Sequence, residues 1–416
     1  MTTRDSSDAI TRQATRLFLW SGFVWRFCTA AYWMLFFIRV VVDVGLSPLE
    51  LILLGTAKEV TILVVEIPTG VVADLRSRRL SVILSFLLCG VAIVGAGLAQ
   101  SFFWLAATQI LWAFGSTFRS GAETAWYTDE VRSLAHVDSV LPQRGRRESA
   151  GSIFGVLGSA VLASVVGLTP ALIAVGVVLL AWGIVLRFRM RETGFQRVET
   201  PGLERAKTIF TDGLTASRRP ALRILLIATV MTGFASEAVD RLQIARLDQI
   251  GFPIEIDVAL VVGGAIVVEA ILSITIIALF GSRLAGKSFV PAAAALHAVT
   301  GVGVFLLAGS EYLVVALVGL VAAGASRDVA RTVTTGWTNH FTDQDNRATV
   351  HSFVGQAMSL GEITGGLILG TIAQQLGLTS ALIGSALIYL AASIVAGMGK
   401  SRWDLKATLR VAKART

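Results

Sequence analysis

The chain has 416 residues, of which 54% are hydrophobic and 15% are charged, and its formal net charge is +8. Soluble domains carry charge on about a quarter of their residues, so this composition excludes an ordinary water-soluble protein. A basic protein can indicate a nucleic-acid partner. Here the basic residues fall in one set of predicted loops, and we expect no nucleic-acid partner.

Three long stretches without Asp, Glu, Lys or Arg indicate repeated crossing of a membrane. They cover residues 80–118, 149–186 and 363–399. Each is nearly forty residues long, which is about 60 Å of helix, whereas the hydrocarbon core of a bilayer is about 30 Å thick. Each stretch must therefore hold two spans with a turn between them.

The whole pattern predicts an all-α membrane protein with twelve transmembrane helices in two six-helix bundles. The basic residues gather in alternate loops, among them Arg76, Arg132 and Arg187, which the positive-inside rule assigns to the cytoplasm. We expect both termini in the cytoplasm, no signal peptide, and a multi-pass protein of the cytoplasmic (cell) membrane. The predicted spans are 17–42, 50–73, 80–99, 102–127, 149–167, 170–187, 221–245, 257–280, 288–308, 311–338, 349–375 and 379–398.

The longest predicted inner loop divides the chain into two halves that repeat one another at an offset of about 205 to 210 residues. We predict an N-terminal bundle over 1–187, a cytoplasmic linker over 188–220, a C-terminal bundle over 221–398 and a basic cytoplasmic tail over 399–416. The linker contains an amphipathic pattern that is typical of a helix lying on a membrane face, with a disordered linker as the alternative. The apolar positions of that pattern are Leu203, Ala206, Phe210 and Leu214.

The stretch 66–80, EIPTGVVADLRSRRL, places a short charged turn between two apolar spans. It resembles the signature loop between helices 2 and 3 of the major facilitator superfamily, a Gly-x-x-x-Asp followed by a basic pair. Leu75 and Ser77 depart from that pattern, because the family usually has a basic residue and a glycine there. The resemblance covers nearly the whole chain. The matching residues are Gly70, Asp74, Arg78 and Arg79.

The resemblance implies a secondary active transporter that moves a small molecule by alternating access, with substrate near the midplane between two bundles. It is similar to proton-coupled exporters of drugs or metabolites, although helix 5 lacks the Gly-Pro-x-x-Gly-Gly element that such exporters often carry. Proton-coupled uptake or facilitated diffusion of a small organic anion is the first alternative. A non-transporting membrane scaffold or lipid-handling protein is the second. We expect a monomer in membrane lipid, driven by the proton gradient without a cofactor.

Catalytic and metal-binding patterns are missing from the sequence. Its four histidines are scattered, and it has no HExxH motif and no nucleophile elbow. The string GSRLAGKS, residues 281–288, satisfies the P-loop pattern, but it joins two membrane spans instead of following a strand and opening a soluble helix. We therefore expect neither an enzyme nor a metal site.

Charged residues inside the predicted spans are functional candidates, because each is costly at membrane depth. Burial disfavours an ionised carboxyl group, which suits a group that loads and releases a proton. Glu123 leads, since it lies deep among small residues. Arg119 precedes it by four positions, so a locked ion pair is the alternative, and Glu237 and Arg241 have the same spacing. The proton-coupling candidates are Glu123, Glu59, Glu269, Asp240 and Glu237.

Two further groups of residues are predicted from position and chemistry. Asp74 should lie near Thr349, at the start of the predicted span 349–375. Arg78 or Arg79 should pair with Asp129 or Glu130. The substrate-cavity candidates are Arg26, Trp33, Arg119, Trp112, Gln243 and Arg327. The cytoplasmic-gate candidates are Gly70, Asp74, Arg78, Arg79, Asp129 and Glu130.

Overall fold

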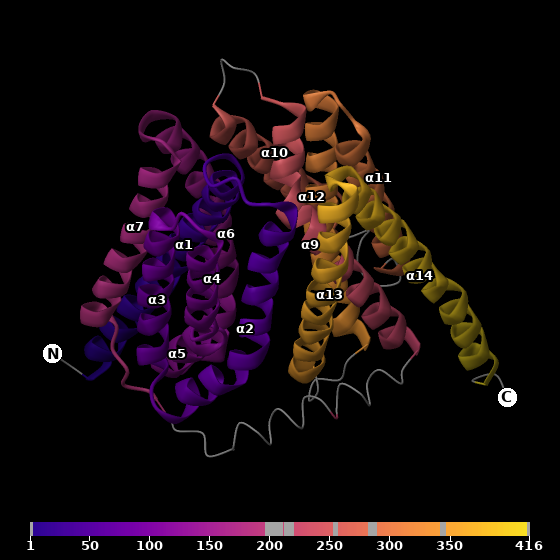
Figure 1. Cartoon of the computed structure of the whole chain (residues 1–416). Helices are drawn as coiled ribbons and strands as arrows, with labels where there is room; N and C mark the ends of the chain where they lie inside the picture. The colour runs from indigo at the N-terminus through magenta and orange to yellow at the C-terminus, as the bar shows by residue number, and fades with distance from the viewer. Residues whose placement is uncertain are drawn as a thin grey trace. The chain divides into compact units, whose positions relative to one another are not determined.

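The structure is a computed structural model that describes residues 3–195, 211, 220–252, 257–281, 289–341 and 347–413. Within these residues every regular element is an α-helix, as the sequence predicts (Figure 1). The helices are α1 (Thr3–Val42), α2 (Pro48–Leu75), α3 (Arg78–Leu98), α4 (Phe102–Thr117), α5 (Ala122–Val131), α6 (Leu134–Val166), α7 (Leu168–Arg189), α9 (Pro220–Ile250), α10 (Val258–Phe280), α11 (Phe289–Gly309), α12 (Leu313–Phe341), α13 (Arg347–Leu376) and α14 (Leu378–Lys413).

Nine helices in the described part of the chain are long and apolar enough to cross a membrane. The segment 102–127, predicted as one span, instead forms α4 and α5 with a break over 118–121. Gly121 lies in this break with φ of 74°, a conformation that glycine adopts without steric cost. The 16 residues of α4 extend only about 24 Å, so this helix is too short to cross the hydrocarbon core alone.

The chain folds into two compact units that are not contiguous in sequence. The first unit comprises Met1–Leu46, Ala57–Arg205 and Pro253–Val267, and the second comprises Ser47–Thr56, Ala206–Phe252 and Val268–Thr416. Helices α2 and α10 therefore contribute to both units. The predicted amphipathic helix around Leu203 to Leu214 lies outside the described residues. The predicted basic tail is the helical continuation of α14 as far as Lys413.

The same helix pairings occur inside each unit. In the first unit α1 packs on α6, and α3 packs on both α4 and α7. In the second unit α9 packs on α13, and α11 packs on both α12 and α14. These are equivalent pairs at the predicted repeat offset, so the internal repeat seen in the sequence corresponds to a repeated arrangement of helices.

Glycines permit the closest of these crossings. A Cβ atom at Gly151 or Gly155 on α6 would overlap the backbone of α1. At the repeat-equivalent positions on α13, a Cβ atom at Gly361 or Gly365 would overlap the backbone of α9. Small residues at such crossings let helix backbones approach closely in membranes. Glycines at equivalent positions of α6 and α13 thus permit the same close crossing in the two units.

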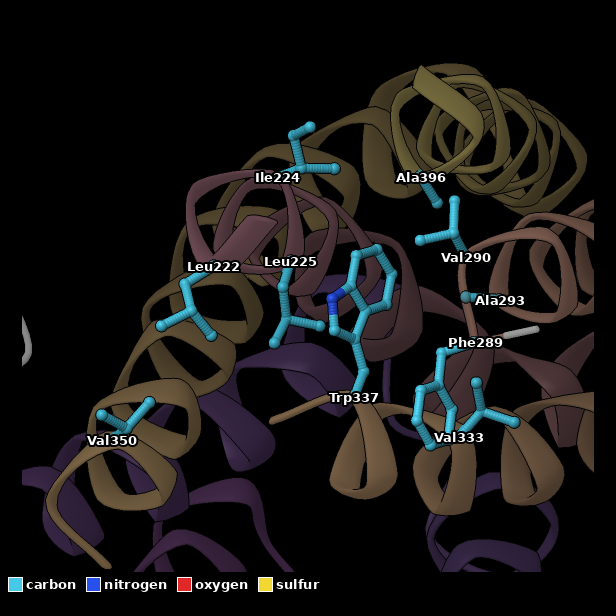
Figure 2. Close-up of a cluster of buried hydrophobic side chains, with 10 residues drawn as sticks. All are labelled: Leu222, Ile224, Leu225, Phe289, Val290, Ala293, Val333, Trp337, Val350 and Ala396. Carbon is cyan, nitrogen blue, oxygen red and sulfur yellow. The ribbon is translucent and has the colours of Figure 1, made fainter. Parts of the chain in front are cut away.

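An apolar cluster joins five helices of the second unit. Figure 2 shows the indole of Trp337, which is only 1% exposed, between Leu225 of α9 and Ala293 of α11. Val350 of α13 and Ala396 of α14 belong to the same cluster. These contacts hold α9 and α12, which carry Asp240 and Arg327 of the cavity described next. The other members are Leu222, Ile224, Phe289, Val290 and Val333.

Candidate functional site

Charged side chains from three helices surround a small cavity in the second unit. Arg327 of α12 donates from Nη2 to Oδ1 of Asp240 on α9, at 2.5 Å. One turn further along α12, Arg331 donates from Nη1 to Oδ1 of Asp328, at 3.0 Å. The cavity has a volume of about 70 Å³. Its lining comprises Val239, Asp240, Gln243, Glu269, Leu320, Ala323, Gly324, Arg327, Asp328 and Arg331.

In the described part of the chain, Glu269 of α10 is the carboxylate of this cavity that forms no ion pair. Among the described residues it forms no ion pair within 4 Å, whereas Asp240 and Asp328 each have an arginine. Three carboxylates thus share the cavity with two guanidinium groups. Gly324 makes room for Glu269, because a Cβ atom at that position would collide with the carboxylate. One proton, or another single cation, would balance the charge.

This cavity brings together four residues that the sequence predicted separately. Asp240 and Glu269 were proton-coupling candidates, whereas Gln243 and Arg327 were substrate-cavity candidates. Helical spacing alone places only Asp240 and Gln243 near one another. The remaining proximities arise from the packing of α9, α10 and α12.

In the first unit, Glu123 lies between two arginines. Its Oε2 accepts from Arg119 Nη1 and from Arg144 Nη2, each at 2.6 Å. Arg144 also donates from Nε to Oε1 of Glu148 on the same helix, at 2.8 Å. The pair of Arg119 and Glu123, predicted from their spacing, is therefore present. Its connection to α6 through Arg144 was not predicted.

Aromatic faces cover the two arginines of this network. The Arg119 guanidinium lies 4.1 Å from the ring centroid of Trp25, and that of Arg144 lies 3.9 Å from the centroid of Phe18. Cation–π contacts of this kind favour a charged guanidinium. Glu123, which is only 3% exposed, is thus surrounded by groups that stabilise its ionised form. The geometry favours the ion-pair alternative for Glu123 over a group that cycles its proton.

A second predicted helical pair is also present. Arg241 Nε donates to Glu237 Oε1 at 2.7 Å, and both side chains are buried. Gly55, in the part of α2 that belongs to the second unit, lies directly against the pair, because a Cβ atom there would overlap both side chains. The pair thus lies where α2 comes close to α9 within this unit.

Glu59, another proton-coupling candidate, has a basic side chain beside it. Glu59 lies 2.5 Å from the ammonium group of Lys58, its neighbour on α2. Lys58 in turn lies over the ring of Trp33, at 5.3 Å from the centroid. Trp33 and Trp112, both predicted to line the substrate cavity, contact one another edge to face with centroids 4.9 Å apart. Arg26 is exposed on α1.

The signature loop forms an ion-pair network on α2, α3 and α5. Arg78 makes a direct ion pair with Asp129, as predicted, and lies 3.6 Å from Asp74. Arg79 donates instead to the carbonyl oxygen of Arg187, at 2.7 Å. A Cβ atom at Gly70 would meet nothing within 4 Å among the described residues. The predicted contact of Asp74 near Thr349 falls outside the described side chains and stays a prediction.

The five residues 191–195 form a strap across this network. Glu192 accepts from Ser77 Oγ at 2.6 Å and from the backbone N–H of Arg79 at 2.9 Å, where the N-terminus of α3 favours a negative charge. Glu130 accepts from the backbone N–H groups of Thr193 and Gly194, at 2.5 and 2.8 Å. The predicted gate residue Glu130 therefore holds the start of the linker, and the first unit extends beyond the predicted boundary at 187.

Sequence reasoning missed Arg144, Glu148, Glu192 and Lys58 as members of these networks. The spacing of four between Arg144 and Glu148 was a usable signal. It was obscured because the predicted fifth span began at 149, whereas α6 begins at Leu134. No local pattern links Glu192 to α3. Within the described part of the chain, no group of three His, Cys, Asp or Glu residues is arranged to bind a metal ion.

The comparison with known families agrees with the helical repeat and the signature loop. The model of the Major Facilitator Superfamily matches residues 18–361. The chain belongs to this superfamily. No curated protein sequence matches it significantly.

Solved structures show the same fold. The nucleoside transporter NupG, as a mutant, superposes with a TM-score of 0.73 at 13% identity, covering 94% of this chain and 99% of that one. A bacterial homologue of the human lysosomal transporter Spinster gives 0.71 at 15% identity, covering 96% and 98%. A POT family transporter in complex with 5-aminolevulinic acid gives 0.73 at 11% identity, covering 93% and 96%. All three are transporters, and at this identity the likeness concerns the fold.

Proposed function

We propose that this protein is a proton-coupled secondary transporter that exports a small metabolite or drug-like compound across the cytoplasmic membrane. Its membership of the superfamily and its transporter neighbours support the general class. Proton coupling, the direction of transport and the kind of substrate are our proposal. We propose Glu269 as the residue that carries the proton.

The observation that carries the proposal is the charge imbalance in the cavity of the second unit. Asp240 and Asp328 each lie against an arginine, and Glu269 lies in the same cavity without one among the described residues. Ionised groups at membrane depth are costly unless they are paired. Protonation of Glu269 removes the uncompensated charge, whereas protonation of Glu123 would break contacts with two arginines. Glu269 is therefore better placed than Glu123 to take up and release a proton in each cycle.

Glu59 and Glu237 are less suited to this task for the same reason. Each carboxylate already lies beside a basic side chain, Lys58 or Arg241. Asp240 is held by Arg327, but it lines the same cavity as Glu269. We propose that the Arg327–Asp240 pair positions the cavity wall while Glu269 alone changes its protonation state.

The test uses purified protein in liposomes with an imposed pH gradient. Uridine, dialanine, ethidium and indole-3-acetate serve as radiolabelled probes. Two quantities are measured: exchange of labelled for unlabelled substrate without a pH gradient, and accumulation driven by an imposed pH gradient. A substrate of the wild-type protein should accumulate on the acidic side, as export in exchange for protons requires. Accumulation on the alkaline side would contradict export and indicate uptake with protons.

The variant Glu269→Gln separates coupling from transport. It should still exchange the substrate, whereas gradient-driven accumulation should fall at least ten-fold. The reason is that a glutamine side chain cannot bind and release a proton. Asp328→Asn is the matched control, since it removes a carboxylate of the same cavity that already has a counter-charge. Gradient-driven accumulation by Glu269→Gln at the wild-type level would remove Glu269 from the mechanism.

A further inference from the structure

An aromatic cluster in the first unit has one lysine over the ring of Trp33. Trp33 contacts Trp112 with centroids 4.9 Å apart and Tyr32 with centroids 4.7 Å apart. Gln109 donates from Nε2 to the Tyr32 hydroxyl at 2.6 Å, which fixes Tyr32 and α4 against one another. Tyr32 is fully buried, whereas Trp33 is partly exposed. The cluster therefore has a rigid base and one accessible indole.

Lys58 supplies a positive charge on top of this accessible indole. Its ammonium nitrogen lies 5.3 Å from the Trp33 ring centroid, and its side chain keeps 16% exposure. Its ionic partner is Glu59, the next residue in the chain, at 2.5 Å. Consecutive residues point in different directions on a helix, so this pair does not join two helices. Glu59, which is itself buried, supplies a counter-ion to Lys58.

Two buried polar atoms of the same cluster lack hydrogen-bond partners among the described residues. They are the indole N–H of Trp112 and the amide oxygen Oε1 of Gln109. Trp112 is 9% exposed and Gln109 is fully buried, and they lie three residues apart on α4. A buried indole N–H usually has a hydrogen-bond acceptor. The cluster therefore has unused hydrogen-bonding capacity beside Trp33.

We infer that Lys58, Trp33 and Trp112 form a subsite for an organic anion with an aromatic body, the Lys58 ammonium binding its carboxylate in place of Glu59. The inference rests on the proposed transport function, because it names the chemical class of the substrate. The rings provide apolar contact for the body of the ligand, and the ammonium provides the charge that selects an acid over its neutral amide. Glu59 acts as an internal competitor that occupies Lys58 when the subsite is empty.

The test is direct binding to purified protein in detergent, measured by titration calorimetry without a proton gradient. The probes are indole-3-acetate, benzoate and salicylate, the neutral amides of the same three acids, and acetate, which has the charge without the ring. At least one aromatic acid should bind ten-fold more tightly than both its own amide and acetate. If no acid exceeds its amide, the assignment is overturned.

Two substitutions on adjacent residues separate binding from a structural role. Lys58→Gln should reduce the affinity for the acid to that for its amide, whereas Glu59→Gln should increase the affinity for the acid several-fold, because the competitor is gone. If the pair were only structural, both changes would break it and lower the melting temperature and the affinity together. Equal weakening by both variants, or retained discrimination in Lys58→Gln, would overturn the subsite.

Trp33→Ala completes the test. It should reduce the binding affinity for the acid and for its amide equally, because it removes the apolar contact that both ligands share. A change confined to the acid would contradict a role for the ring. This outcome is independent of proton coupling. Failure of Glu269→Gln to uncouple transport would overturn the proposed coupling while leaving the anion subsite supported by the binding data.

Discussion

The two units each contain a glutamate in a different electrostatic setting on a repeated helical scaffold. In the first unit, Glu123 accepts from two arginines at 2.6 Å each, and one of them is also paired with Glu148. In the second unit, Glu269 shares a cavity with two other carboxylates whose arginines are already engaged. The helix pairings are equivalent, but the charges differ. A repeat can therefore keep its packing while the ion pairs in its two halves differ.

The largest expected effect distinguishes these two glutamates by stability. Glu123→Gln should lower the free energy of unfolding by about 3–5 kcal/mol, because it leaves buried guanidinium charge without its partner. Glu269→Gln should leave the melting temperature within a few degrees of wild type, since the wild-type carboxylate has no ion pair to lose among the described residues. Thermal melts of both variants in detergent compare them directly. Equal melting temperatures would remove the distinction.

A double substitution sharpens the same comparison. Arg144 keeps Glu148 when Glu123 is neutralised, so Arg119 is the cation left without a carboxylate. Arg119→Gln/Glu123→Gln should therefore recover most of the lost stability. Arg144→Gln/Glu123→Gln should recover less, because it strands both Arg119 and Glu148. The reverse order would show that Arg144 is the main partner of Glu123.

The next largest effect tests the packing that the units share. Gly155→Ala and Gly365→Ala should each lower stability by about 1–3 kcal/mol or more, because the added methyl group meets helix backbone that must move apart. Gly158→Ala on α6 and Gly355→Ala on α13 are matched controls with open space around them among the described residues. The melting temperatures of Gly155→Ala and Gly365→Ala should both fall, whereas those of the two control variants should stay near that of the wild type. A large effect in only one unit would contradict equivalent packing.

The strap over the signature loop should be sensitive to one methyl group. Gly194→Ala should lower stability by about 1–3 kcal/mol, because its Cβ atom would overlap the carbonyl oxygen of Asp129. Gly145→Ala is the control, with nothing close to it among the described residues. Chemical unfolding that follows tryptophan fluorescence reports the change, since Trp126 donates to the carbonyl oxygen of Arg191 in the strap. An unchanged midpoint would show that the strap contributes little.

Gly324→Ala should affect transport more than stability. The added methyl group meets the end of the Glu269 side chain, which rotates away at a cost of about 1 kcal/mol for a strained rotamer. Displacement of the carboxylate should reduce gradient-driven accumulation several-fold while exchange continues. Gly264→Ala on α10 is the control, because a Cβ atom there meets nothing within 4 Å in the described structure. Parallel losses of exchange and accumulation would contradict a specific effect on coupling.

The smallest expected effect on stability belongs to Asp74. It lies 3.6 Å from Arg78, which keeps its ion pair with Asp129 when Asp74 is neutralised. Asp74→Asn should lower stability by less than about 1 kcal/mol, typical of a partly exposed pair, and slow transport if the loop acts as the predicted gate. Expression level, melting temperature and initial flux are measured together. Wild-type flux would count against a gate at this residue.

Local sequence patterns predicted the membrane helices, the family, two helical ion pairs and the internal repeat of this protein. The charge-free runs predicted membrane helices because a bilayer of fixed thickness demands apolar segments of fixed length. The residues of the signature loop gave the family, and spacing of four along a helix gave the pairs Arg119–Glu123 and Glu237–Arg241. The repeat offset predicted equivalent helix packing, which the glycines of α6 and α13 confirm. Each of these inferences depends on residues close together in the chain or on a regular period.

Only the tertiary structure decided which charges share an environment. Arg144 reaches Glu123 because α6 packs beside α5, and Glu192 reaches α3 because the chain folds back after α7. Sequence distance carries no information about such contacts. The sequence therefore put Glu123 ahead of Glu269, whereas the fold separates the two by the cations that neighbouring helices bring within a few ångströms of each carboxylate.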